Sequence, residues 1–366
     1  MEEIYKNTID QLIIDLPFIA KEVVEYQYRL QPQFEKYGKK GFLKSLEDGK
    51  YNLQYLLSAV EVDSIKLFEQ YIKWVNGLMI NLNLPNTTIE VFYNCTKDIM
   101  KNKFENGIIE KGLYEKISLY IDSGLSTLKY YVSDIEEGDT NNPYKIILDK
   151  YSEFVLSGNK KSAVAEIIKL ANSDEIELRH IYKYILQPFQ IKVGNLWHKN
   201  KITVGEEHYA TAISQYVMSM LYDKIFSTPK NDKIFLGTCV EGELHEIGIR
   251  MICDYIESCG WNTYYLGANM PSYGIVNEII TKKPNVIGIS CTMTFNIYKV
   301  KSLIETIKVS GIKTPIIVGG YPFNVDEELW LKVGADGYSR NFDEVSTLIE
   351  SLSEGKLWWN LMKNGL

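Results

Sequence analysis

One of the four histidines in this 366-residue chain lies in a pattern suited to holding a metal. The run Glu243-Leu-His245-Glu-Ile-Gly248 has a carboxylate two residues before the imidazole and a glycine three residues after it. A carboxylate can accept the hydrogen bond of one ring nitrogen and so orient the other toward a metal. A glycine lets a bulky flat ligand approach the backbone, because it has no Cβ. We therefore predict that His245 is a metal ligand, that Glu243 is its hydrogen-bond partner and that Gly248 borders the ligand.

Two shorter motifs follow at a distance along the chain. Ser290-Cys-Thr292 comes after residues 249–289, and Gly319-Gly320 comes after residues 293–318. Taken alone, Glu-x-His is more often a loop histidine bonded to its neighbour, and Gly-Gly is more often a plain turn at a strand end. The three motifs acquire meaning only if the fold brings them together.

The sequence from Lys233 onward predicts such a fold. Short β-rich runs at 233–238, 263–266, 286–290, 316–320 and 335–339 alternate with helical stretches at 247–259, 272–282, 296–309 and 325–332, and another helix follows Asn341. This alternation is typical of βαβ units and of a parallel sheet. We expect a flavodoxin-like, doubly wound α/β domain whose ligand binds beyond the carboxyl ends of the strands. All three motifs lie at those ends.

The rest of the chain is predicted to be helical. Apolar residues recur every three or four positions in residues 1–133, and residues 144–228 are expected to form four helices. The acidic, turn-rich segment 134–143 between them is the predicted linker. Thr203-Val-Gly-Glu206 has the form of a capping box, which would start the last helix of the four there. The predicted domains are thus 1–133, 144–228 and 229–366.

Composition limits the classes of function. The formal net charge is −7 and only four arginines are present, which argues against direct DNA binding. The N-terminus is acidic where a signal peptide would be basic, and no stretch of 18 apolar residues occurs, so we expect no membrane span. The five cysteines are odd in number and lack Cys-x-x-Cys spacing, as expected for reduced thiols in a cytoplasmic protein.

In their order and spacing the three motifs resemble those of cobalamin-binding domains in which a histidine replaces the dimethylbenzimidazole base of the cofactor. These domains carry an acidic-x-His-x-x-Gly loop, then Ser-x-Thr or Ser-x-Leu, then Gly-Gly. The resemblance implies that His245 ligates cobalt from below and that Ser290 and Thr292 contact the displaced dimethylbenzimidazole tail. It further implies that Gly319 and Gly320 line the tunnel for that tail.

A finer resemblance points to cobalamin-dependent photoreceptors. Most cobalamin enzymes of this class have Asp where this chain has Glu243, whereas the photoreceptors carry Gly-Glu-x-His. Their helical cap has a Trp followed ten residues later by Glu-His, as in Trp197, Glu207 and His208 here. The resemblance implies that Trp197 packs over an upper adenosyl group, that Glu207 contacts its ribose and that His208 ligates cobalt after photolysis. Taken singly, these residues have simpler interpretations as a core aromatic, a charge near a helix N-terminus and a solvated histidine.

Residues 1–133 loosely resemble globin-like sensor regions without haem. No histidine precedes His180, which excludes a His-ligated haem there. The layout resembles photocobilins, which pair cobalamin with biliverdin, and the residues considered for a bilin pocket are Tyr26, Tyr28, Tyr51, Tyr55, Arg29 and Cys95. The alternative for all of these residues is ordinary packing of a helical bundle.

The resulting hypothesis is a light sensor that binds adenosylcobalamin, with biliverdin as a further chromophore, and needs no catalytic turnover. Photolysis would change oligomeric state, as in a homo-oligomer, or contacts with a downstream signalling protein. The alternative is a corrinoid protein that carries methyl groups in a methyltransferase system. A third option, a subunit of a radical mutase, would need a substrate barrel of about 250 residues from a partner chain.

Overall fold

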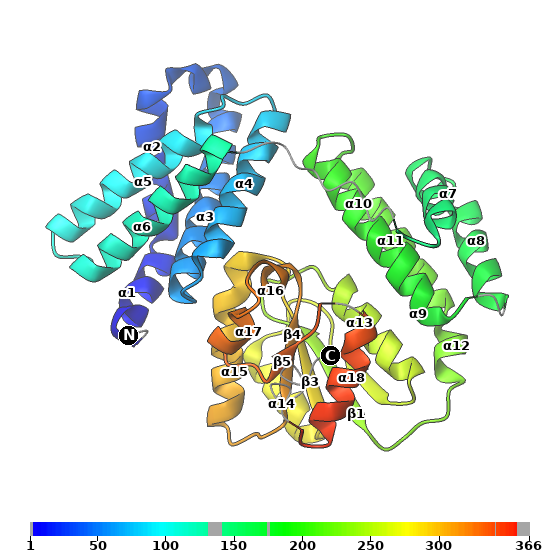
Figure 1. The fold of residues 1–366 in the computed structure, drawn as a ribbon. Helices are drawn as coiled ribbons and strands as arrows, with labels where there is room; N and C mark the ends of the chain where they lie inside the picture. The colour runs from blue at the N-terminus through cyan, green and yellow to red at the C-terminus, as the bar shows by residue number, and fades with distance from the viewer. Residues whose placement is uncertain (1–2, 131–140, 174–175, 341, 357–366) are drawn as a thin grey trace. The chain divides into compact units, whose positions relative to one another are not determined.

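The computed structural model describes residues 3–130, 141–173, 176–340 and 342–356. The chain divides into two compact units (Figure 1). Unit 1 comprises Met1–Ser133, Met293–Tyr298 and Asn324–Val333, and unit 2 comprises Asp134–Thr292, Lys299–Phe323 and Gly334–Leu366. The predicted linker at 134–143 falls mostly outside the described residues.

The described N-terminal residues of unit 1, 3–130, form six α-helices, in agreement with the helical spacing of their apolar residues. They are α1 (Glu3–Ile14), α2 (Leu16–Leu30), α3 (Gly38–Glu61), α4 (Ile65–Asn81), α5 (Thr88–Glu105) and α6 (Lys111–Thr127). Two 3₁₀ turns, Pro32–Tyr37 and Leu128–Tyr130, complete the helical region. The helices bury their apolar stripes, with Phe68, Ile72 and Val75 of α4 inside the bundle. Gly124 permits α6 to approach α4 closely, because a Cβ there would lie 2.8 Å from the Phe68 ring.

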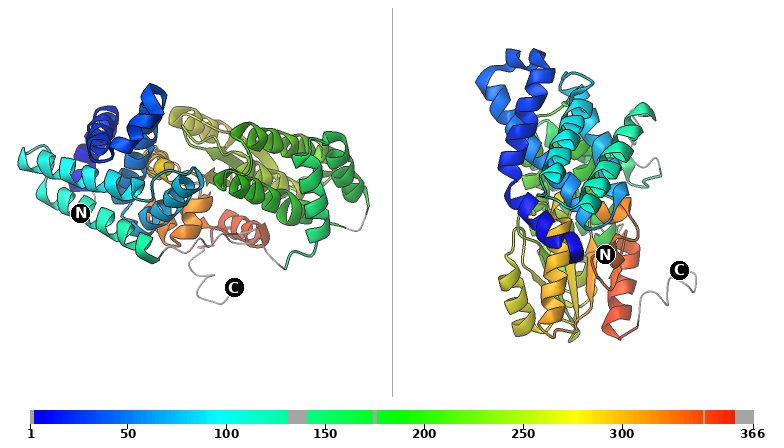
Figure 2. Two further views of the ribbon diagram at one scale, coloured as in Figure 1. Left: turned by 90° about the horizontal axis from the view of Figure 1, so that it is seen from above. Right: turned by 90° about the vertical axis from the view of Figure 1, so that its left-hand side faces the viewer.

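The helical part of unit 2 precedes its sheet. It contains α7 (Lys145–Leu156), α8 (Lys160–Asn172), α9 (Leu178–Ile181), α10 (Gln187–His198), α11 (Val204–Met220) and the short α12 (Tyr222–Phe226). Helices α10 and α11 lie side by side (Figures 1 and 2). The third of the four predicted helices is divided in the structure. A π-helical turn at Tyr182–Leu186 separates α9 from α10. Pro188 follows this turn, and a proline cannot donate the backbone hydrogen bond of a regular helix.

The α/β part of unit 2 has the predicted five-stranded parallel sheet in the order β2-β1-β3-β4-β5. The strands are β1 (Ile234–Cys239), β2 (Asn262–Tyr265), β3 (Val286–Ser290), β4 (Ile316–Gly319) and β5 (Gly337–Tyr338). Figure 1 shows α13 (Ile247–Ser258) and α18 (Phe342–Ser353) on one face of the sheet, and α14 (Ser272–Lys282) and α15 (Ile297–Val309) on the other. This order and the parallel pairing agree with the flavodoxin-like expectation.

One predicted helix of this region is wrong. The stretch 325–332 was expected to be a single helix, but the chain forms two short ones, α16 (Tyr321–Val325) and α17 (Leu329–Lys332). The buried side chain of Asp326 accepts a hydrogen bond from the Glu328 backbone N–H at 3.3 Å. Such a local bond competes with helix continuation and begins a new turn instead.

Helix α13 ties the helical and α/β parts of unit 2 together. The Tyr182 hydroxyl donates to the buried Asp254 carboxylate of α13 at 2.9 Å. The Arg250 guanidinium, one turn earlier, donates to the Ser219 and Tyr222 hydroxyls at 2.8 and 3.0 Å. Because α13 begins at Ile247, two residues after His245, these bonds attach the helical part to the element that follows the predicted metal ligand. Among the described helices, none is long and apolar enough to cross a membrane.

Candidate functional site

The strand ends bring the three sequence motifs to one edge of the sheet. Cys239, the last residue of β1, pairs with Ser290 of β3, and Ser290 pairs with Gly319 of β4. The loop carrying Glu243 and His245 leaves the same edge. Segments separated by some forty residues in sequence are therefore neighbours at the carboxyl ends of β1, β3 and β4, where parallel α/β sheets bind ligands.

Glu243 is the buried residue that connects the segments at this edge of the sheet. Its side chain is fully buried, and its Oε1 accepts hydrogen bonds from His245 Nδ1 at 2.7 Å and from the His245 backbone N–H at 3.0 Å. Its Oε2 accepts from the Thr292 backbone N–H at 3.0 Å and from the Cys291 thiol at 3.7 Å. These donors satisfy the buried charge. The carboxylate thus joins the histidine loop to the end of β3.

The hydrogen bond to Glu243 determines how His245 can act. With Nδ1–H donating to the carboxylate, the lone pair resides on Nε2. The His245 side chain is 54 % exposed, so Nε2 can reach a ligand outside the protein core. The geometry therefore fits a single imidazole ligand presented to a metal that a cofactor carries.

The glycines test whether the site fits a large flat cofactor. A Cβ added at Gly248 or Gly319 would meet no atom within 4 Å, and neither residue has a left-handed backbone. The protein's own packing and backbone therefore give no reason for glycine at these two positions, whereas close approach by a ligand would. Gly320 is different: its φ is 109° and a Cβ would lie 2.0 Å from the Cys291 carbonyl oxygen. That glycine is required by the fold itself.

Neighbouring thiols do not compete with His245 as metal ligands. Burial raises the pKa of Cys239 to about 12, and burial with the nearby Glu243 charge raises the pKa of Cys291 well above its usual range. The thiolate, not the thiol, is the form that binds metals, so both side chains remain poor ligands at neutral pH.

Two further residues at this edge of the sheet, Cys291 and Glu246, were not among the predicted site residues. Cys291 lies inside the Ser-x-Thr motif at the position treated as variable. Glu246 directly follows His245, and its carboxylate accepts from Gln215 of α11 at 3.3 Å and from the Ala268 backbone N–H at 2.9 Å. An acidic residue at the start of a helix was the only available signal for Glu246.

The predicted upper-face residues lie on α10 and α11. Trp197 is half-buried in the last turn of α10. The capping box exists as expected, with the Thr203 hydroxyl accepting from the Glu206 N–H at 3.2 Å. It starts α11, so Glu207 and His208 lie in its first turns. The Glu207 carboxylate holds Nδ1 of His208, whose side chain is 76 % exposed.

The residues considered for a bilin pocket fall into separate clusters. Tyr28 packs on Phe34 and Phe42, whereas Tyr51 and Tyr55 pack on Phe295. Tyr26 lies beneath the Arg29 guanidinium. Burial raises the pKa of the Cys95 thiol to about 11, which makes it a poor nucleophile for attaching a chromophore. This arrangement matches the helical-packing alternative.

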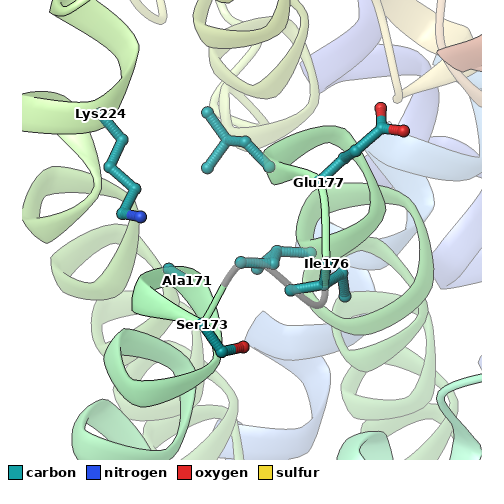
Figure 3. Close-up of a pocket in the computed structure, with 7 residues that line it drawn as sticks. Ala171, Ser173, Ile176, Glu177 and Lys224 are labelled. Carbon is teal, nitrogen blue, oxygen red and sulfur yellow. The ribbon is translucent and has the colours of Figure 1, made fainter.

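A cavity of about 270 Å³ lies elsewhere, in the helical part of unit 2 (Figure 3). Its lining residues are Ala171, Ser173, Ile176, Glu177, Leu178, Ile181 and Lys224. Figure 3 shows the Glu177 carboxylate turned away from Lys224. None of these residues belongs to the predicted site, so the cavity is separate from the strand-end motifs.

Comparison with known proteins finds two matching domain models and several similar proteins. Models described as "B12 binding domain" match residues 234–345 and, separately, residues 147–222. The dimethylamine corrinoid protein 1 of Methanosarcina mazei is 27 % identical over 215 residues, which are 57 % of this chain and 97 % of the relative. A corrinoid protein of Desulfitobacterium hafniense is 24 % identical over 214 residues, covering 56 % and 97 % of the two chains.

A solved structure has the same fold in part. The monomethylamine corrinoid protein of Methanosarcina barkeri is 19 % identical, covers 56 % of this chain and 97 % of its own, and has a TM-score of 0.50. The relatives are named as corrinoid proteins, which favours the methyl-carrier alternative over the light sensor. Residues 147–222 and 234–345 of this chain are thus similar to B12 binding domains, and this similarity supports cobalamin binding.

Proposed function

We propose that this protein is a corrinoid carrier that holds cobalamin through His245 and presents its upper face to methyltransferase partners. The observation that carries the proposal is the fully buried Glu243, which fixes Nδ1 of His245 and leaves Nε2 for cobalt. The corrinoid relatives support the choice of carried group. In this function the chain is a carrier, and the catalytic turnover belongs to its partners.

Each residue of the site would have a separate role in holding the cofactor. His245 would supply the lower ligand, and Glu243 would keep its tautomer and orientation through the hydrogen bond at 2.7 Å. Ser290 and Thr292 would contact the tail of the cofactor, while Gly248 and Gly319 leave room for it. When bound, cobalamin supplies a cobalt ion that can accept and release a methyl group.

The test of the lower ligand uses the purified full chain with hydroxocobalamin. The chain is labelled with 15N-histidine, so that after reduction to the cob(II)alamin form, electron paramagnetic resonance should show the doublet splitting of one 15N histidine nitrogen. His245→Ala should lose this doublet, and His198→Ala, a histidine of the helical part, should retain it. A 15N doublet that survives His245→Ala would overturn the assignment.

The test of the carried group uses a purified methyltransferase specific for dimethylamine, with monomethylamine and trimethylamine systems as parallel samples. The absorbance of the reduced, cobalamin-loaded chain should change when dimethylamine and its methyltransferase are added together, and should not change when either is added alone. If the chain holds cobalamin through His245 yet no system methylates it, the methyl-carrier function fails for methylamines while cobalamin binding stands.

A second candidate function is light sensing, and His208 is the observation that favours it. Glu207 holds Nδ1 of this exposed histidine, as Glu243 does for His245, so its Nε2 could ligate cobalt once an adenosyl group has left. In this alternative, light would alter oligomeric state or contacts with a downstream signalling protein, with biliverdin as a further chromophore.

Green light separates the two functions. The chain loaded with adenosylcobalamin in the dark should, if it is a sensor, shift on illumination to a bis-histidine spectrum with a changed elution volume. His208→Ala should lose that photoproduct and His198→Ala should keep it. If the sensor also uses biliverdin, a parallel sample with biliverdin should develop a red-absorbing band. Slow, unspecific aquation with unchanged assembly would exclude light sensing.

A further inference from the structure

Two short segments of the α/β sequence pack into unit 1 with the N-terminal helices. Met293–Tyr298 follows β3 and Asn324–Val333 follows β4 after α16 begins. Both belong to the same compact unit as residues 1–133. The chain therefore crosses between the units immediately after Thr292 and again soon after Gly320, two residues assigned to cofactor contact.

Phe295 is the apolar anchor of the first segment. Its ring meets the Tyr55 ring edge-on at 5.3 Å between centroids and lies 5.6 Å from the Tyr51 ring, both on α3. The Ser58 hydroxyl of the same helix donates to the Phe295 carbonyl oxygen at 3.1 Å. Aromatic pairs of this geometry add stability beyond the area they bury. Helix α3 thus holds both the side chain and the backbone of this segment.

Asp326 is the polar anchor of the second segment. Its carboxylate is 1 % exposed and accepts from the Ser64 hydroxyl at 2.5 Å and from Lys332 Nζ at 2.8 Å. Lys332 Nζ also donates to the Asp63 carbonyl oxygen at 3.0 Å. A buried charge is strongly destabilised when one partner is removed, so this network resists being pulled apart. The turn between α3 and α4 thus holds the second segment.

A short stretch of backbone connects the Phe295 anchor to the predicted cobalamin site. Phe295 lies three residues beyond Thr292, whose N–H donates to Glu243, and Glu243 in turn holds His245. A cofactor tail that displaces the end of β3 would therefore pull on the segment held by α3. If loading the site changes how firmly α3 holds this segment by some factor, linkage requires the hold to change cobalamin affinity by the same factor.

We propose that residues 1–133 are a built-in regulator of the cobalamin site, coupled to it through the segments anchored by Phe295 and Asp326. Loading the site changes how firmly α3 and the following turn are held, and the N-terminal helices change the affinity in return. This inference rests on the cobalamin binding of the proposed function and not on methyl transfer, so a failure of methyl transfer alone leaves it standing.

Hydrogen exchange on the full chain tests the coupling. Peptides covering residues 51–66 are compared with and without hydroxocobalamin, and the dissociation constant is measured by absorbance. We expect loading to change exchange of these peptides at least about threefold in the wild type. Phe295→Ala should remove that difference and change the dissociation constant about fivefold or more. Phe18→Ala is the matched control, because its ring is 72 % exposed on α2, and it should behave as the wild type.

The outcomes separate the hypotheses. Normal cobalamin binding with unchanged exchange at 51–66, or with full coupling retained in Phe295→Ala, overturns the regulator. Failure to bind hydroxocobalamin removes the cofactor assignment and the regulator together. If Phe295→Ala does not fold, Ser64→Ala replaces it, since this variant removes one hydrogen bond to Asp326 and should weaken the coupling in the same direction.

Discussion

At the scale of single residues, paired glycines at the end of β4 have different reasons to be glycine. Gly320 is needed by the fold, whereas a Cβ at Gly319 would meet no atom of the chain. The sequence could show only that both are glycine. Substituting each glycine separately should therefore distinguish an effect on cobalamin affinity from an effect on protein stability.

We expect Gly320→Ala to destabilise the protein by about 2–4 kcal/mol, because the new methyl group meets the Cys291 carbonyl in a left-handed backbone. Gly319→Ala should change the free energy of unfolding by less than about 1 kcal/mol but weaken cobalamin binding at least tenfold. Urea unfolding and absorbance titration measure the two effects. Unchanged affinity in a well-folded Gly319→Ala would remove Gly319 from the binding surface.

Asp254 makes a pH-dependent contribution to stability. Burial raises the pKa of this carboxyl to about 7, although the Tyr182 hydroxyl and Arg250 oppose the shift. Its folded pKa lies above the unfolded value, so the stabilisation is complete below about pH 4 and is lost as pH rises through 7. Measured against Asp254→Asn, the free energy of unfolding of the wild type should therefore be lower at pH 8 than at pH 5.

The difference in unfolding free energy between Asp254→Asn and the wild type should grow by about 2–4 kcal/mol from pH 5 to pH 8. Urea denaturation at several pH values measures it. Asp149→Asn is the control, because Lys145 lowers the pKa of that exposed carboxyl and it titrates below this range. A pH-independent difference for Asp254→Asn would show that the carboxyl is ionised throughout.

At the scale of elements, α11 depends on its first turn. The Thr203 hydroxyl accepts a hydrogen bond from the Glu206 N–H, and the Glu206 carboxylate accepts one from the Thr203 N–H at 2.7 Å. The sequence predicts this reciprocal cap from Thr203 and Glu206 alone, because a capping box needs only these two residue types three positions apart. It positions Glu207 and His208 on the next residues of the helix.

Thr203→Ala should cost about 1 kcal/mol of stability through loss of the cap. Exchange should rise in the first turn of α11, measured by peptides covering residues 203–210. Val204→Ala is the control, since that side chain is 58 % exposed and makes no cap. Equal exchange in the two variants would mean that neighbouring helices, not the cap, define this helix end.

The strands and most helices were predictable because their signals are local. Apolar runs bounded by turn residues located all five strands to within a few positions, and helical spacing located the buried faces of α3 and α4. Local chemistry also explains the errors. The π turn precedes Pro188, which lacks a backbone donor, and the break at Asp326 coincides with a hydrogen bond from the Glu328 N–H to its carboxylate; periodicity of apolar residues reveals neither.

At the scale of the whole molecule, ligand binding should be visible in stability. Hydroxocobalamin at about one hundred times its dissociation constant should raise the free energy of unfolding by about 2.7 kcal/mol. The gain should be smaller in His245→Ala and unchanged in His198→Ala, as followed by urea denaturation. An equal gain in all three proteins would mean that cobalamin is held without His245.

The sequence by itself determined the parallel α/β domain, the helical regions before it and the three motifs at the strand ends. These follow from local periodicity and from the rule that parallel strands end at one edge. Only the tertiary structure decided that Glu243 also binds the end of β3, that Gly320 abuts Cys291 and that α3 holds Phe295. Each of these contacts joins residues far apart in the chain, so its formation depends on packing and not on any pattern within one element.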